Sequence, residues 1–444
     1  MRALILSAPV GAGHDAAARG IAAELAARGY HVEIDNGLAL LDGRLKRFIL
    51  GTYRLQLERA EWSWRLLYRV TRSNLLIRAV GVALAMLGGR RLVARVEQSR
   101  ATLVVSTYPL VSAPLAALRR SGKLSVRCAT MVTDVDPHPA WIHSSLDANL
   151  TVGDAGRGCI AARPPIADFT PPPGTRSAIR ARLGLSSTAR VALIVGGAWG
   201  VGDLEGAARA AIHAKLCPIV VCGHNEALAA RIRTAPSLVD ARVLGYSAEL
   251  PALMAASDVL IQNAGGLTCL EAFNVGLPVV MYNPLAGHGK ANARRMERHG
   301  LVSLARDGAS LTAILRSMTF WATVSTEQAG RARRLYDRPS CGELFDAIPR
   351  RRMATRRLRQ RVRATATVAV CFAAFGVADA PAATAGTFHR APERVCASAA
   401  NPAPVLHQSR FDERRVTALA AVITWFYVSR RTSSTAAIRT AIAV

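Results

Sequence analysis

Residues 262–271 constrain the fold of this chain more than any other stretch. The apolar segment 258–262 predicts a buried strand, and after the glycine turn at Gly265 and Gly266 a helix is expected to open at Thr268. Such a turn presents free backbone N–H groups and the positive end of a helix dipole at one point. The stretch therefore favours a bound phosphate, although an ordinary strand-to-helix turn would use the same glycines.

Glu271 lies about one turn into this expected helix. A carboxylate there cannot favour an anion, so its expected role is to accept hydrogen bonds from a neutral diol such as a ribose. A phosphate site and a ribose site side by side indicate a nucleotide diphosphate.

Strand and helix patterns alternate on both sides of a proline-rich segment, residues 163–175. The alternation predicts α/β architecture, with two doubly wound, Rossmann-like domains at 1–162 and 176–346 that face a central cleft. The strands are expected at 2–9, 30–34, 102–106, 126–132, 190–195, 218–222, 242–244, 258–262 and 278–282. Residues 347–444 form a basic, low-complexity tail. Basic, apolar and small residues follow one another in the tail in the order typical of a secretory signal peptide, which suggests a fused exported segment. The alternative is a disordered basic tail.

Basic residues outnumber acidic ones, with a net charge of +27 and a pI near 11.2. This balance implies an anionic partner: nucleic acid, anionic lipid or a phosphorylated substrate. Residues 44–95 hold 12 basic and 2 acidic residues among bulky apolar side chains, which predicts amphipathic helices at an anionic membrane surface, or helices that cap the domain. No stretch there reaches the roughly 20 apolar residues that a span needs. No nucleic-acid-binding module is recognisable, so nucleic acid is not expected as a partner.

The eight cysteines form no CxxC pair, and the amino terminus enters directly into a strand. Both features are typical of a reduced, cytoplasmic protein. Asp134, Asp136 and His138 could suggest a metal, but loop positions interrupted by two prolines make a poor ligand cage. No metal is expected.

His14 and Asp134 each follow an expected strand. Ligand sites of open α/β sheets gather at the carboxyl ends of the strands, so both side chains should lie at such a site. The loop before His14 carries only Gly11 and Gly13, which does not meet the GxGxxG fingerprint of a dinucleotide site.

Several motifs together match a known family: residues 11–14, 133–141, 263–271 and 276–278, with Gly196, Gly197 and Gly287. Over about residues 1–335 the chain resembles glycosyltransferases of the B fold, most closely the monogalactosyldiacylglycerol synthase and processive diacylglycerol glucosyltransferase group. A more distant likeness is to the N-acetylglucosaminyltransferase that makes peptidoglycan lipid II. The chain departs from the family at three places. Gly11-Ala12-Gly13 stands where three glycines are usual, Asn263 where lysine or serine is common, and Arg163-Pro164-Pro165 where Gly-Ile-Pro is usual before the linker.

The resemblance implies an inverting transfer of a hexose from a UDP-sugar to a lipid hydroxyl, with no cofactor besides that donor. The donor would bind the carboxyl-terminal domain and the lipid the amino-terminal one. The expected location is cytoplasmic, peripheral on the inner face of the plasma membrane. Alternatives are N-acetylglucosamine transfer to a cell-wall lipid precursor, nucleotide-sugar epimerisation, or nucleic-acid binding without catalysis.

An inverting transfer needs a base for the acceptor hydroxyl and stabilisation of the departing diphosphate. We expect His14 to be the base, with Asp134 as its orienting partner or as the alternate base. Glu271 should hold the ribose, and His288 and Asn292 the sugar or phosphate. The full set expected to bind the donor is Gly196, Gly197, Asn263, Gly265, Gly266, Thr268, Glu271, Gly287, His288 and Asn292.

Overall fold

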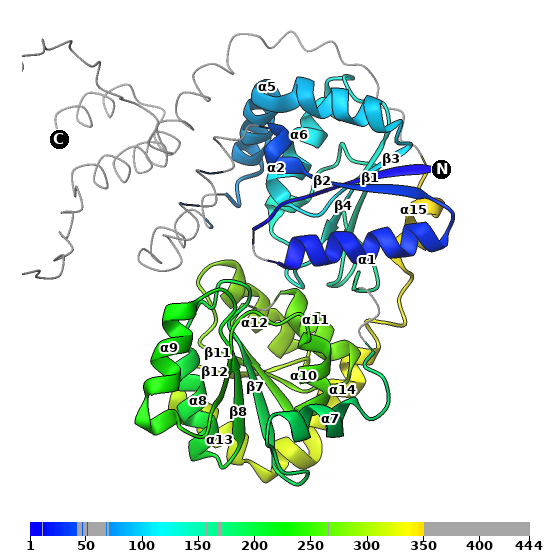
Figure 1. The fold of residues 1–444 in the computed structure, drawn as a ribbon. Coiled ribbons are helices and arrows are strands. Elements are labelled where there is room, and N and C mark those ends of the chain that lie inside the picture. Colours follow the sequence, from blue (N-terminus) through cyan, green and yellow to red (C-terminus); the bar gives the residue numbers. More distant parts are fainter. Residues whose placement is uncertain are drawn as a thin grey trace, which may run out of the picture. The chain divides into compact units, whose positions relative to one another are not determined.

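The computed structural model describes residues 1–10, 12–41, 47, 51, 68, 71–156, 158–166, 170–264 and 266–349. These residues form two parallel six-stranded sheets with helices packed on both faces (Figure 1). We call the described residues up to 166 the first half and those from 170 the second half. Most of the basic tail, and most of the expected amphipathic region between residues 42 and 70, lie outside the described residues.

The first half follows the expected strand and helix pattern and adds two short strands. In chain order its elements are β1 (Arg2–Ser7), α1 (Gly13–Ala27), β2 (His31–Asn36), α2 (Gly37–Leu41), α5 (Asn74–Ser99), β3 (Leu103–Ser106), α6 (Pro109–Arg120), β4 (Arg127–Val132), the 3-10 turn η1 (Pro139–Trp141), β5 (Ala148–Thr151) and β6 (Ile160–Ala161).

The second half begins at α7 and repeats the alternation. Its elements are α7 (Thr175–Arg182), β7 (Val191–Val195), α8 (Leu204–His213), β8 (Cys217–Val221), α9 (Glu226–Thr234), the 3-10 turn η2 (Pro236–Leu238), β9 (Arg242–Leu244), α10 (Leu250–Ala256), β10 (Val259–Gln262), α11 (Leu267–Asn274), β11 (Val279–Tyr282), α12 (His288–Arg298), β12 (Ser303–Ala305), α13 (Gly308–Arg316), the π-helical segment η3 (Phe320–Val324), α14 (Ser325–Arg333) and α15 (Cys341–Ala347).

Both sheets are doubly wound. The first has the order β2-β1-β3-β4-β5-β6 and the second the order β12-β11-β10-β7-β8-β9. In each, the chain leaves the first strand in one direction and later returns to build on its other side. The strand order therefore reverses between β1 and β3 and between β7 and β10. Crevices for ligands open at such switch points, at the carboxyl ends of the strands.

The central strands are apolar along their whole length because both faces of each sheet are covered. In β7, Leu193 packs toward α10 and α11, whereas Ala192 and Ile194 pack toward α8 and α13. Figure 1 shows these two helical layers on opposite sides of the second sheet. This two-sided burial explains why the strands appear in the sequence as continuous apolar runs.

Helix α5 uses part of the region that was expected to be amphipathic. Its buried face packs on α2 and α6: a Cβ on Gly88 would lie 2.2 Å from Leu41, and one on Gly81 would lie 2.6 Å from the Ala113 carbonyl oxygen. One face of α5 therefore caps the domain. Its outer face exposes Leu75, Met86 and Leu87. None of the helices in the described ranges combines the length and hydropathy needed to cross a bilayer.

Helix α15 follows the second sheet in sequence but packs on the first half. Asp346 accepts hydrogen bonds from Arg28 Nε at 2.5 Å and from the Tyr30 hydroxyl at 2.7 Å. The Gly342 N–H donates to Glu24 at 3.1 Å. The end of the second half is thus anchored to α1 and to the residue before β2.

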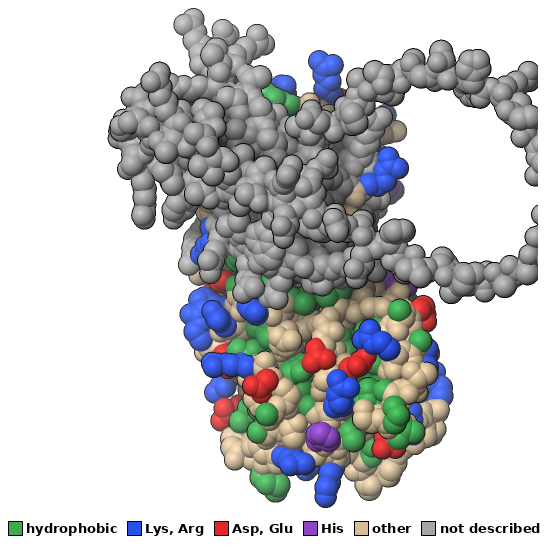
Figure 2. Space-filling model, turned by 90° about the vertical axis from the view of Figure 1, so that its left-hand side faces the viewer, with side chains coloured by type: hydrophobic (Ala, Val, Ile, Leu, Met, Phe, Trp, Pro, Cys, Tyr) green, Lys and Arg blue, Asp and Glu red, His purple; other side chains and the backbone are tan. Residues whose placement is uncertain are grey.

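On the face that Figure 2 shows, the visible basic and acidic side chains of the second half are interspersed. The large positive charge of the chain is therefore not gathered into one basic patch on this visible surface of the second half.

Candidate active site

His14 lies at the switch point of the first sheet, in the first turn of α1. Its ring meets the Tyr108 ring edge-on at a centroid distance of 5.0 Å, and the Trp141 ring lies 5.9 Å away. Nδ1 is buried and has no hydrogen-bond partner among the described residues. Burial lowers the pKa of His14, and the nearby Asp134 carboxylate and Thr107 backbone oppose this shift only in part. The imidazole is therefore neutral at neutral pH, the form that a general base requires.

Asp134 lies two residues beyond β4, at the same edge of the sheet. Its Oδ1 accepts a hydrogen bond at 2.7 Å from Nδ2 of Asn292, a residue of α12. Asp134 thus acts on His14 through its charge, while its hydrogen bond joins the two halves of the molecule. Asn292, expected to contact the sugar or phosphate, is buried, and its Oδ1 accepts the Asp136 N–H in the loop after β4.

At the switch point of the second sheet, the loop after β7 meets the end of β10. Gly196 and Gly197 open this loop. Asn263 donates from Nδ2 to the Val201 carbonyl at 2.6 Å, and its buried Oδ1 has no partner among the described residues. A Cβ on Gly202 would lie 1.8 Å from Asn263 Nδ2, and Gly202 has a φ of 107°, so this position admits only glycine.

Helix α11 begins at Leu267, one residue before the expected start, with Gly266 as its N-cap. No side chain caps it, and the Cys269 N–H donates to the Gly266 carbonyl oxygen at 3.0 Å. Thr268 is half-buried in this first turn. Burial raises the pKa of Glu271 to about 7, and Arg19 of α1 opposes the shift. Gly265 lies outside the described residues.

Helix α12 also starts without a side-chain cap. Its N-cap Gly287 has φ 67° and ψ −115°, a conformation that side chains disfavour. His288 is its first residue, and burial lowers the pKa of His288 while the Asp134 carboxylate opposes the shift. A positive charge on His288 would lower the pKa of His14, so the two rings, and with them the starts of α12 and α1, lie near each other.

The amino-terminal ends of three helices therefore converge on His14. A Cβ on Gly13, the first residue of α1, would lie 3.7 Å from Cβ of Leu267, the first residue of α11. Each end contributes the partial positive charge of its helix dipole. The arrangement can hold an anion next to a neutral imidazole.

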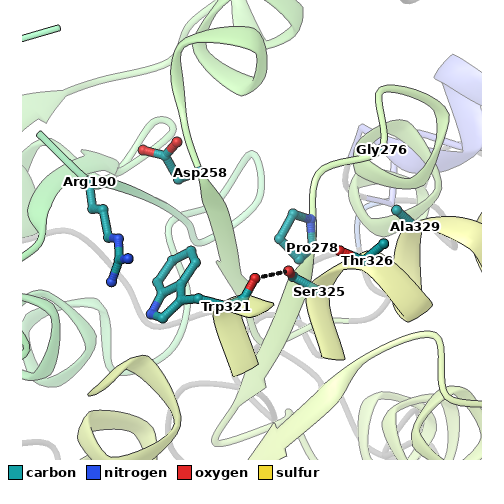
Figure 3. Close-up of a pocket in the computed structure, with 8 residues that line it drawn as sticks. All are labelled: Arg190, Asp258, Gly276, Pro278, Trp321, Ser325, Thr326 and Ala329. Carbon is teal, nitrogen blue, oxygen red and sulfur yellow. Dashed lines mark hydrogen bonds between the residues drawn. The ribbon is translucent and has the colours of Figure 1, made fainter. Parts of the chain in front are cut away.

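A cavity of about 340 Å³ lies elsewhere, at the opposite edge of the second sheet (Figure 3). Arg190, Asp258 and Pro278 line it, and each directly precedes a strand. The Arg190 guanidinium lies 4.8 Å from the centroid of the Trp321 ring. None of the residues expected to act in catalysis or donor binding lines this cavity. Its size alone does not outweigh the convergence of groups at the carboxyl edges.

Within the described ranges, no three His, Cys, Asp or Glu side chains come close enough together to hold a metal ion. His138, considered as a possible ligand, instead accepts the Ala140 N–H at Nδ1, while Nε2 lies 3.1 Å from the Tyr68 carbonyl oxygen.

Sequence reasoning missed Tyr108 and Trp141, the two aromatic residues that enclose His14. Tyr108 could have been found, because it comes two residues after β3, at the same carboxyl edge as His14. Trp141 belonged to a recognised motif but was given no role. Its approach to His14 depends on how the loop after β4 folds back.

Comparisons with known proteins identify both halves. Residues 14–154 match the family model of monogalactosyldiacylglycerol (MGDG) synthase, and residues 192–316 match the glycosyltransferase family 28 C-terminal domain. The processive diacylglycerol beta-glucosyltransferase of Bacillus pumilus (strain SAFR-032) is 27% identical over 319 residues, 67% of this chain and 81% of the relative. A protein of the same name from Bacillus cereus (strain B4264) is 25% identical over 279 residues, 60% of this chain and 71% of the relative.

Solved glycosyltransferases share the architecture. VinC, in complex with DTDP, superposes with a TM-score of 0.53 at 16% identity, over 78% of this chain and 98% of VinC. The spinosyn rhamnosyltransferase SpnG gives a TM-score of 0.52 at 15% identity, over 78% of this chain and 99% of SpnG. Together, the family matches, the two doubly wound sheets and the structural neighbours make this chain a glycosyltransferase of the B fold, with an amino-terminal domain of the MGDG synthase type and a carboxyl-terminal domain of family 28.

Proposed function

We propose that this chain transfers a hexose from a UDP-sugar to a hydroxyl of a diacylglycerol-type lipid at a membrane surface. The observation that carries the proposal is the neutral His14 imidazole beside three converging helix amino termini. The names of the relatives, processive diacylglycerol beta-glucosyltransferases, support a lipid acceptor and a hexosyl group.

The proposed reaction is a single in-line displacement with inversion at the anomeric carbon. The lipid oxygen forms a bond to that carbon as the bond to the diphosphate oxygen breaks, and UDP leaves with the electron pair. His14 takes the proton of the lipid hydroxyl. The uncapped ends of α11 and α12, with the loop at Gly196 and Gly197, would stabilise the charge that develops on UDP, so the proposal requires no metal.

The function is tested by incubating the purified chain with diacylglycerol vesicles and radiolabelled UDP-glucose, UDP-galactose or UDP-N-acetylglucosamine. We expect label in the glycolipid fraction from one of the hexose donors. Label that enters only an added cell-wall lipid precursor would select the alternative acceptor. Interconversion of UDP-sugars without lipid would select epimerisation. Either result overturns the proposal, as would a shift of nucleic acid without binding of UDP.

Replacement of Glu271 by Gln should remove a pH dependence of donor binding. The pKa of Glu271 is raised to about 7, so in the free protein the carboxylate forms as the pH rises through 7. Only the carboxylate accepts both ribose hydroxyls, so wild-type affinity for a UDP-sugar should rise between pH 6 and 8. Glu271→Gln should bind about 10-fold or more weakly at pH 8, with a flat profile. Calorimetry with UDP-glucose measures this, and equal profiles for the two proteins would remove Glu271 from the site.

We further propose that the outer face of α5 contacts the membrane, and that the enzyme works at the inner face of the plasma membrane. That face combines the exposed apolar side chains Leu75, Met86 and Leu87 with the exposed basic residues Arg78, Arg90 and Arg91. Apolar groups that insert among headgroups next to arginines that neutralise them are typical of interfacial helices.

Replacing Arg78, Arg90 and Arg91 by Ser should weaken binding to anionic vesicles by about 1 kcal/mol per charge, roughly 100-fold or more in total. A matched triple variant of the second half, with Ser at the exposed positions Arg233, Arg306 and Arg334, has the same net charge and should bind nearly as wild type. Vesicle sedimentation compares the two. Equal losses would mean that overall charge, rather than the α5 face, holds the protein at the membrane.

A further inference from the structure

The Asn292 side chain joins the two halves of the molecule through both ends of its amide. Nδ2 donates to Oδ1 of Asp134 at 2.7 Å, and Oδ1 accepts the Asp136 N–H at 2.8 Å. The residue is 1% exposed. A donor and an acceptor are needed at once, so only an amide of this length satisfies both partners.

The same helix that presents Asn292 also presents His288. The two residues are four apart on α12 and therefore share one of its faces. His288 lies at the uncapped start of the helix, where the donor diphosphate is proposed to bind. The donor site and the contact to Asp134 are thus parts of one rigid element.

The Asp134 carboxylate lies close to His14 and to several other titratable side chains. A carboxylate within reach of His14 stabilises the imidazolium that forms when the base takes a proton. The titratable groups near Asp134 are His14 of α1, His288 of α12, Asp136 and His138 of its own loop, and Tyr68.

We propose that Asn292 is a positioning residue for the transfer, which fixes the Asp134 carboxylate in reach of His14 only while α12 is docked against the first half. The inference rests on the proposed function. The hydrogen bond from Asn292 links the donor-binding helix α12 to the base, because a displaced α12 would leave Asp134 without this bond. A counter-charge fixed before the reaction costs no reorganisation during it.

The test compares Asn292→Ala and Asn292→Asp with a control on the same helix, Arg295→Ala. Arg295 also reaches the first half, with a 3.0 Å ion pair to Asp154, but does not contact Asp134. Initial rates of transfer from UDP-glucose to diacylglycerol vesicles are measured between pH 6 and 8. Asn292→Ala should lower kcat by about 10- to 100-fold at every pH, with a smaller effect on the KM for UDP-glucose. Arg295→Ala should stay within about threefold of wild type.

Asn292→Asp gives a readout that a merely structural role would not produce. At pH 8 its new carboxylate repels Asp134, so activity should be as low as in Asn292→Ala. Two carboxyl groups in contact bind a shared proton as the pH falls, and the protonated group can again donate to its partner. The activity of Asn292→Asp relative to wild type should therefore rise several-fold from pH 8 to pH 6.

A relative activity that does not change with pH overturns the inference, as do equal losses in Asn292→Ala and Arg295→Ala. The relative activity of Asn292→Asp at pH 6 is compared with that of the same variant at pH 8. A folding defect that is equal at both pH values would therefore not produce the expected rise. Absence of transfer by the wild-type protein would instead overturn the proposed function.

Discussion

His14→Ala should lower turnover by about 10²- to 10⁴-fold, the usual contribution of a general base, while the affinity for the UDP-sugar changes little. The imidazole is held at the carboxyl edge of β1 between the rings of Tyr108 and Trp141, and burial lowers its pKa. His14 therefore combines a neutral base with a position at the switch point of the first sheet.

The lowered pKa of His14 also sets the pH dependence. The base must be unprotonated, and its protonated form becomes populated only below the ordinary histidine range. Wild-type kcat, measured with both the UDP-sugar and the lipid saturating, should therefore stay constant as the pH falls to below 6.5 and should decrease only at lower pH. If His14→Ala loses less than tenfold while Asp134→Ala abolishes transfer, Asp134 is the base. If both variants stay near wild type, the displacement mechanism is wrong.

Arg119→Met should have the largest effect on stability, a loss of about 3 to 5 kcal/mol in the free energy of unfolding. Arg119 Nη2 and Asp147 Oδ1 are 2.6 Å apart, and both side chains are almost fully buried, with 3% and 2% exposure. Asp147 Oδ2 also accepts the Cys128 N–H at 2.7 Å. Without the guanidinium, an uncompensated carboxylate remains in the core of the first half. The midpoint of urea unfolding measures the loss.

The double variant Arg119→Met/Asp147→Leu is the control. It removes both charges, so it should recover a large part of the lost stability even though the ion pair is absent. Breaking the exposed pair between Arg331 and Glu327, whose side chains are 43% and 51% accessible, should change stability by less than about 1 kcal/mol. A double variant no more stable than Arg119→Met would show that packing, rather than the orphaned charge, causes the loss.

The sequence alone determined the local part of this structure. Each central strand is buried on both faces, so it appears as a short apolar run, and the expected strand positions were confirmed to within one or two residues. Parallel strands place their carboxyl ends at one edge, so His14, Asp134, Asn263 and Glu271 could be assigned to the two ligand edges before any contact was known. The strands β5, β6 and β12 were missed because they are short or carry weak patterns.

The tertiary structure decided what depends on segments far apart in the chain. Asp134 and Asn292 are 158 residues apart, and no periodicity predicts that they share a hydrogen bond. The raised pKa of Glu271 follows from its burial, with Arg19 of α1 acting against the shift. Helix α15 ends the second half in sequence but packs on the first. Local residue patterns fix which elements form and which edge each side chain reaches, whereas the pairing of distant side chains, and the pKa values that result, are fixed only when the two sheets and their helices pack together.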